Sequence, residues 1–115
     1  RQGRLPPARV SPPEPLGPSM NLPAFAPLVG DSFEIRLPKG EVLLVLLLSA
    51  RDLGPRPLGP PGERSFSLVF RSSLARHLPQ AIYRLWHPKL GTLELFLVPI
   101  GPDAQGGVCY QAVFN

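Results

Sequence analysis

The residues that could do chemistry are few and widely spaced. The two histidines, His77 and His87, lie ten residues apart, with no cysteine or carboxylate at metal-ligand spacing around either. A zinc site needs several nitrogen, sulfur or oxygen ligands at short, defined spacings. We therefore expect neither histidine to bind a metal or to act in catalysis, and we interpret both as surface or turn residues.

The other reactive groups match no catalytic motif. No serine stands in a G-x-S-x-G elbow, and no G-x-x-x-x-G-K-[ST] phosphate loop occurs. Glu34, Glu41 and Glu94 could approach each other across a sheet, but alternation favours outward polar positions for them. Cys109, the single cysteine, lies in an alternating stretch, where a packing or surface residue is commoner than a nucleophile. We expect neither enzymatic activity nor a cofactor.

The aromatic residues Tyr83, Trp86, Phe96 and Tyr110 are more informative. Alternation places Trp86 and Tyr83 on opposite faces of one strand, so large side chains occur on both faces. Either the domain packs on both faces or one aromatic patch is exposed to a partner, because Trp and Tyr favour interfaces. Packing is the commoner role for any one of them, and both alternatives stay open.

The charge distribution argues against a nucleic-acid partner. Residues 1–19 carry three arginines against one glutamate, which is half of the total net charge of +4. The other charges are interspersed, without a basic run or an RNA-binding motif. The longest apolar run, Val42–Leu48, is also far shorter than the ~20 residues of a membrane-spanning helix. We expect no nucleic acid and no membrane span.

Residues 1–19 form a proline-rich segment, which we call the arm. Their prolines favour polyproline II over a strand or helix. In that conformation the arm would present Leu5, Val10 and Leu16 to grooves lined by aromatic residues. The sequence predicts two parts, an extended arm over residues 1–19 and a β domain over residues 20–115.

The β domain is expected to begin with a short helical segment, Asn21–Gly30, with Asn21 as N-cap. Phe25, Leu28 and Val29 would dock this segment on the core. The run Val42–Leu48 fits a strand covered on both faces, although its periodicity alone does not exclude a buried helix. The stretch Gly54–Gly62 is rich in glycine and proline and predicts a surface loop.

Alternating segments predict the remaining strands and the core. They lie within residues 32–37, 65–71, 80–87, 92–98 and 108–114, and a turn with Pro88 and a positive φ at Gly91 joins two of them. The inward residues are expected to be Phe33, Ile35, Phe66, Leu68, Phe70, Leu93, Leu95 and Leu97. With Val42–Leu48 this makes a small all-β domain, a six-stranded antiparallel sandwich or barrel.

Four runs resemble a known family: FAPLVGDSFEI at 25–35, FSLVFR at 66–71, YRLWHPKLGTLELFLVPIGPD at 83–103 and YQAVFN at 110–115. The chain resembles an uncharacterised bacterial family of short β-rich proteins, classed only as a domain of unknown function. That family transfers no activity and no catalytic residue. The resemblance implies an association with phage-tail-collar or tail-fibre-like proteins.

These observations predict a non-enzymatic structural or interaction module, a subunit or accessory of a bacterial surface or tail-fibre-like homo-oligomeric assembly. The arm would contact a neighbouring subunit, and an extracellular or cell-surface location is favoured over a cytoplasmic one. The alternative is a small-ligand-binding or enzymatic β-barrel, which requires a concave pocket with convergent polar groups. The candidate interaction residues are Leu5, Val10, Leu16, Trp86, Tyr83, Phe96 and Tyr110.

Overall fold

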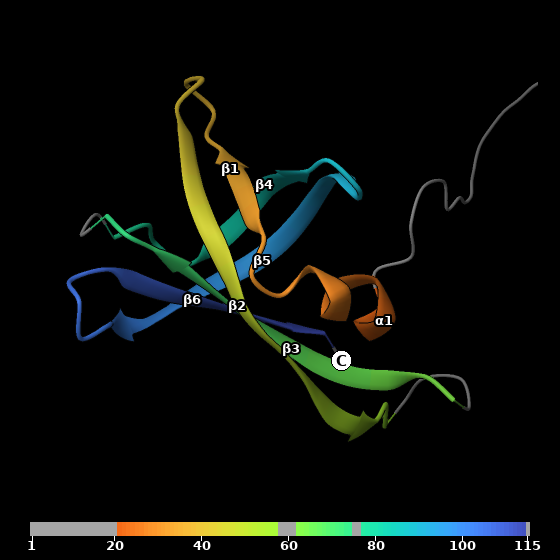
Figure 1. Cartoon of the computed structure of the whole chain (residues 1–115). Coiled ribbons are helices and arrows are strands. Elements are labelled where there is room, and N and C mark those ends of the chain that lie inside the picture. The colour runs from red at the N-terminus through yellow and green to blue at the C-terminus, as the bar shows by residue number, and fades with distance from the viewer. Residues whose placement is uncertain (1–20, 58–61, 75–76, 115) are drawn as a thin grey trace, which may run out of the picture.

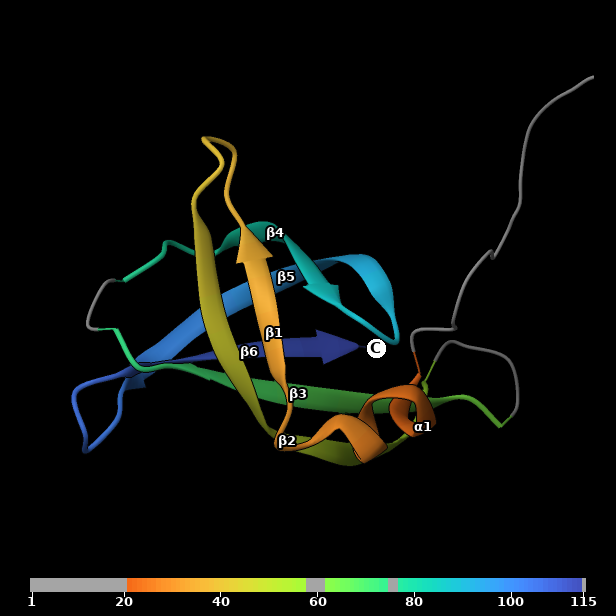
Figure 2. The same cartoon turned by 45° about the horizontal axis from the view of Figure 1, so that its top comes forward.

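The protein folds as a closed antiparallel β-barrel. A computed structural model describes residues 21–57, 62–74 and 77–114, so the arm lies outside the described residues. The elements are α1 (Leu22–Phe25), the 3₁₀ turn η1 (Ala26–Leu28), β1 (Ser32–Arg36), β2 (Val42–Pro55), β3 (Arg64–Ser72), β4 (Ala81–His87), β5 (Gly91–Pro102) and β6 (Val108–Phe114). The strands close in the order β1-β2-β3-β6-β5-β4 (Figures 1 and 2). The all-β prediction is confirmed, and of its two forms the structure is the barrel.

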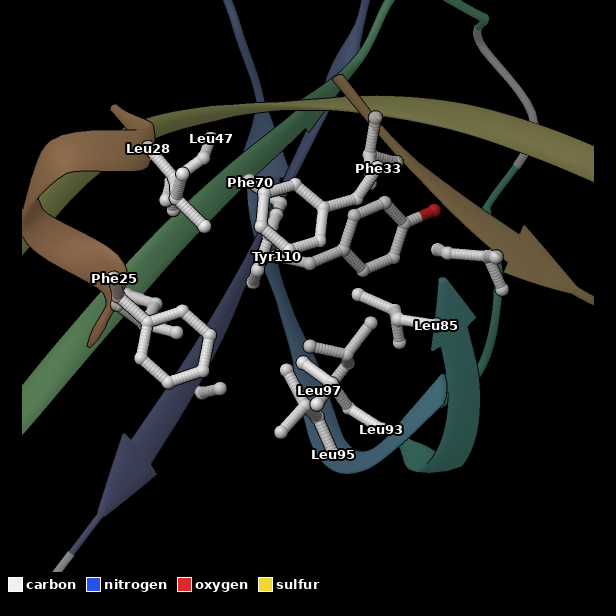
Figure 3. Packing of buried hydrophobic residues seen from close by; sticks show 14 of the residues in the cluster. Phe25, Leu28, Phe33, Leu47, Phe70, Leu85, Leu93, Leu95, Leu97 and Tyr110 are labelled. Carbon is white, nitrogen blue, oxygen red and sulfur yellow. The ribbon is translucent and has the colours of Figure 1, made fainter. Parts of the chain in front are cut away.

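The interior of the barrel is filled by side chains. All eight residues predicted to face the core are buried, none of them more than 7% exposed. Leu47, Leu85 and Tyr110 join them in one cluster (Figure 3). A barrel of so few strands has an interior just wide enough for its own side chains, so the alternating residues of β1, β3 and β5 meet in a single core.

Strand β2 differs from its prediction. Leu43, Val45 and Leu47 point inward and are buried, but Leu44 on the other face is 60% exposed. Val42 and Leu48 are also exposed. The prediction that this strand is covered on both faces is wrong, because the barrel is a single sheet closed on itself and only one face of each strand reaches the core.

The helical segment caps one end of the barrel. The Asn21 side chain accepts a hydrogen bond from the Ala24 amide (3.0 Å), which confirms the predicted N-cap. Phe25 and Leu28 are buried as expected. Val29 is 44% exposed, so its predicted docking is wrong. The chain turns there towards β1, because the Gly30 amide donates to the Leu47 carbonyl (2.8 Å) of β2.

The structure tests the predictions for two connections between strands. Gly91 has φ +72° in the turn between β4 and β5, as predicted. The predicted loop from Gly54 begins too early, since β2 continues to Pro55 past a bulge at Asp52/Gly54. The Asp52 carboxylate accepts hydrogen bonds from the Gly54 amide (2.8 Å) and the Arg64 side chain, which stabilises the bulge.

Candidate interaction surface

Two of the four candidate aromatic residues in the described part of the chain serve the barrel itself. Tyr110 is fully buried, and its hydroxyl accepts a hydrogen bond from the Leu78 amide (3.0 Å). The hydroxyl of Tyr83 donates to the Pro79 carbonyl, and burial followed by the proximity of Tyr110 raises the pKa of Tyr83. Both tyrosines therefore hold the connection between β3 and β4 against the barrel.

Trp86 lies on the outer face of β4 and is half-buried. The guanidinium of Arg36 on the neighbouring strand β1 lies 4.9 Å from the centre of its ring. Glu34 accepts a hydrogen bond from Arg36 (3.1 Å) and fixes that cation in place. A cation over an exposed indole contributes about 0.5–1 kcal/mol. The tryptophan face is thus covered by a charged side chain from its own domain.

Phe96 is the most exposed of the predicted aromatic residues, at 52%. It pairs across β4 and β5 with Ile82, which is 68% exposed. Val113 on β6 is 49% exposed and lies two residues beyond Gln111, which pairs with Val98 of β5. We call Ile82, Phe96 and Val113 the outer apolar patch. Ile82 and Val113 were not among the predicted interaction residues, although alternation places both on the outer faces of their strands.

A second exposed apolar row follows β2, with Val42, Leu44 and Leu48 on its outer side. Its neighbour on β1 is polar, since Leu44 pairs with Glu34. The row is therefore an aliphatic stripe beside a charged strand. The remaining candidates, Leu5, Val10 and Leu16, lie outside the described residues.

His87 ends β4 and adjoins the turn, as expected, but the prediction of a surface position is wrong. It is only 2% exposed, because it shares the inner face of β4 with Leu85. Its Nε2 lies 2.9 Å from the Asp31 carboxylate, its Nδ1 accepts from the Lys89 amide (3.0 Å), and its ring packs on Phe33. The local partners satisfy both nitrogens, which makes its burial possible. His77 is exposed.

A half-buried ion pair fixes the turn between β5 and β6. Arg71 on β3 forms an ion pair with Asp103, whose carboxylate also accepts from the Gln105 and Gly107 amides (2.9 and 2.8 Å). The hydrogen bond from Arg71, followed by those backbone bonds, lowers the pKa of Asp103. Gly107 leaves no room for a side chain, because a Cβ there would lie 2.2 Å from the Ser72 carbonyl oxygen. These contacts are structural.

Metal ligands do not gather in the residues described: no group of three or more His, Cys, Asp or Glu side chains lies close together there. Within the same residues, neither short helical element has the length or apolar character needed to cross a membrane. The site with the clearest geometry is thus a surface, the outer apolar patch with the β2 stripe.

The fold and this surface define the class: a small all-β barrel domain with a packed interior and apolar positions on its outside. Residues 20–114 match the family described as a domain of unknown function, DUF6916, and the chain belongs to that family. The predicted resemblance to such a family is confirmed to this extent. No curated protein and no solved structure matches the chain.

Proposed function

We propose that this domain is a non-enzymatic interaction module that binds protein partners through the outside of its barrel. One observation carries the proposal: ten large apolar residues of the described part are 42–68% exposed, while the interior is already filled. Apolar groups that gather on a surface mark interaction sites. The filled interior favours this function over the alternative of a ligand-binding or enzymatic barrel, which needs a pocket.

The arm is the proposed contact to a neighbouring subunit. Polyproline II keeps its backbone groups solvated and offers apolar side chains to a partner with little loss of entropy. Leu5, Val10 and Leu16 would supply those side chains, and the part of Trp86 that Arg36 leaves exposed would belong to the receiving surface on the next subunit. The family match begins at residue 20, so the arm lies outside the matched residues.

The proposal also includes the type of assembly and its location. A bacterial surface or tail-fibre-like assembly, with an extracellular location, is supported by the resemblance alone. It stays a prediction. The interaction role does not depend on it.

Solution mass at several concentrations tests the proposal. We expect the chain 1–115 to form a homo-oligomer, and the chain lacking residues 1–19 to keep its circular dichroism spectrum while losing or weakening the oligomer. A matched control replaces Arg1, Arg4 and Arg9 by Gln, which removes the arm's positive charge and keeps its apolar residues; this variant should assemble like the parent chain.

The outcomes separate the parts of the proposal. A full-length chain that is monomeric at all concentrations would refute self-association. An oligomer of unchanged size and stability after deletion of the arm would refute the arm's role and leave the barrel surface as the contact.

A further inference from the structure

Strand β5 changes its partners halfway along its length. Residues Gly91–Leu97 pair with β4, and Val98–Pro102 pair with β6. On the other side, β6 pairs with β3 as far as Phe114. Within the described part of the chain, the facing sides of residues 91–97 and 112–114 therefore have no strand partner. Figures 1 and 3 show β5 and β6 diverging there, and we call this region the fork.

The fork leaves backbone groups unpaired. Alternate residues of an antiparallel strand direct their N–H and C=O groups to the same side, so part of residues 91–97 presents these groups to the fork. The paired side of the same residues is occupied by β4. An unpaired edge of this kind is a template for another extended chain.

The base of the fork is closed by the core. Phe25 of α1 packs against Phe114 of β6, with ring centres 5.8 Å apart, and belongs to the same core cluster as the inward leucines of β5 (Figure 3). Leu95 and Leu97 are at most 2% exposed. A strand added at the fork would therefore contribute no side chains to the core. It would bind through backbone pairing and through contacts on the outer side.

The outer side of the fork carries exposed apolar residues. Phe96 on β5 and Val113 on β6 are each about half exposed, at 52% and 49%, and Ile82 extends the apolar surface onto β4. The charged residues nearest in the β4–β5 ladder, Arg84 and Glu94, pair with each other at 3.7 Å. The fork thus combines unpaired backbone with exposed apolar side chains at Phe96 and Val113, and its one outward carboxylate, Glu94, is paired with Arg84. This fits an extended partner whose outward side chains are apolar where they meet Phe96 and Val113.

We propose that the fork binds an extended, proline-free segment of a partner protein by strand addition, with alternate apolar side chains packed on Phe96 and Val113. This inference deepens the proposed function, on which it rests, by naming the kind of partner. The arm is unsuited to this site, because six of its residues from Pro6 to Pro18 are prolines without an N–H donor. The arm and the fork are separate contacts.

A synthetic peptide tests strand addition on the chain 1–115. The probe is acetyl-Lys-Thr-Val-Thr-Val-Thr-Val-Lys-amide, with two further versions N-methylated at alternate residues, on the valines or on the threonines. Backbone amide NMR and hydrogen exchange are the readouts. We expect shifts within Gly91–Leu97 and residues 112–114, with new protection only within Gly91–Leu97, where the peptide pairs. One methylated version should bind at least about tenfold more weakly, because an edge uses only one set of donors.

Surface variants provide the matched comparison. Phe96→Lys should weaken peptide binding by about tenfold or more. Leu44→Lys changes a similarly exposed residue, at 60%, in the part of β2 that pairs with β1, and should leave binding unchanged. If Phe96→Lys loses its folded spectrum, Val113→Lys takes its place.

Three results would overturn the proposal: no binding of the parent peptide at millimolar concentration, equal binding of both methylated peptides, or shifts confined to the stripe on β2. The solution-mass experiment and the peptide-binding experiment test different claims. A chain that is monomeric but binds the peptide refutes self-association and supports strand addition at the fork. A chain that forms an arm-dependent oligomer but does not bind the peptide supports self-association and refutes strand addition.

Discussion

Strands β2 and β5 are both rich in leucine, but they use their two faces differently. On β5, inward Leu93, Leu95 and Leu97 alternate with Thr92, Glu94 and Phe96, so apolar character and burial largely coincide. On β2 both faces are apolar, yet only one reaches the core, and Leu44 remains 60% exposed. Apolar character alone therefore does not indicate burial. What decides it is the side of the closed sheet on which a residue lies.

The largest effect is expected for an inner residue of β5. Leu95→Ala removes a side chain that is 2% exposed and leaves a cavity in the core. Such changes lower the free energy of unfolding by about 2–5 kcal/mol. Chemical denaturation monitored by tryptophan fluorescence measures it. A change near zero in the free energy of unfolding would mean that Leu95 lies on the outer face of β5.

Tyr110→Phe tests a polar contact inside the same core. The substitution keeps the ring but removes the hydroxyl that accepts from the Leu78 amide. A buried donor left without its acceptor costs about 1–3 kcal/mol. Tyr83→Phe is the comparison, because its hydroxyl bonds to the Pro79 carbonyl at an exposed position, where water can replace it, and it should cost less. Equal costs would show that the Leu78 amide finds another acceptor.

The sequence predicted the strands well and their closure poorly, for a physical reason. Alternation is local, so the inward residues of β1, β3 and β5 could be read directly. Closure depends on β1 pairing with β4, which is a contact between distant segments. His87 shows the same limit: its burial depends on Asp31, 56 residues away. Among the candidate interaction residues, Phe96 is exposed, whereas Tyr110 lies in the core. Residue type alone could not distinguish them, because tyrosine is common both in interfaces and in cores.

An acid-dependent effect is expected at the turn between β5 and β6. Since Arg71 lowers the folded-state pKa of Asp103 below the ordinary carboxyl value of 3.8, the folded state binds fewer protons than the unfolded state. The stability from this group is complete above pH 3.8 and is lost as the pH falls through the lowered value. Asp103→Asn should flatten the dependence of unfolding on pH below that point. An unchanged pH profile, measured by urea denaturation, would contradict this role.

The smallest effect is expected on the outer face of β2. Leu44→Thr replaces an exposed residue by one that favours strands, in a position paired with Glu34. Away from buried features such changes stay within about 0.5 kcal/mol. Urea denaturation at several protein concentrations measures it, with Leu43→Thr as the inward neighbour, which should cost far more because Leu43 is buried. A loss at Leu44 that grows with protein concentration would mean that another copy covers the stripe in solution. A large loss that is independent of concentration would contradict the assignment of this face to the outside of the barrel.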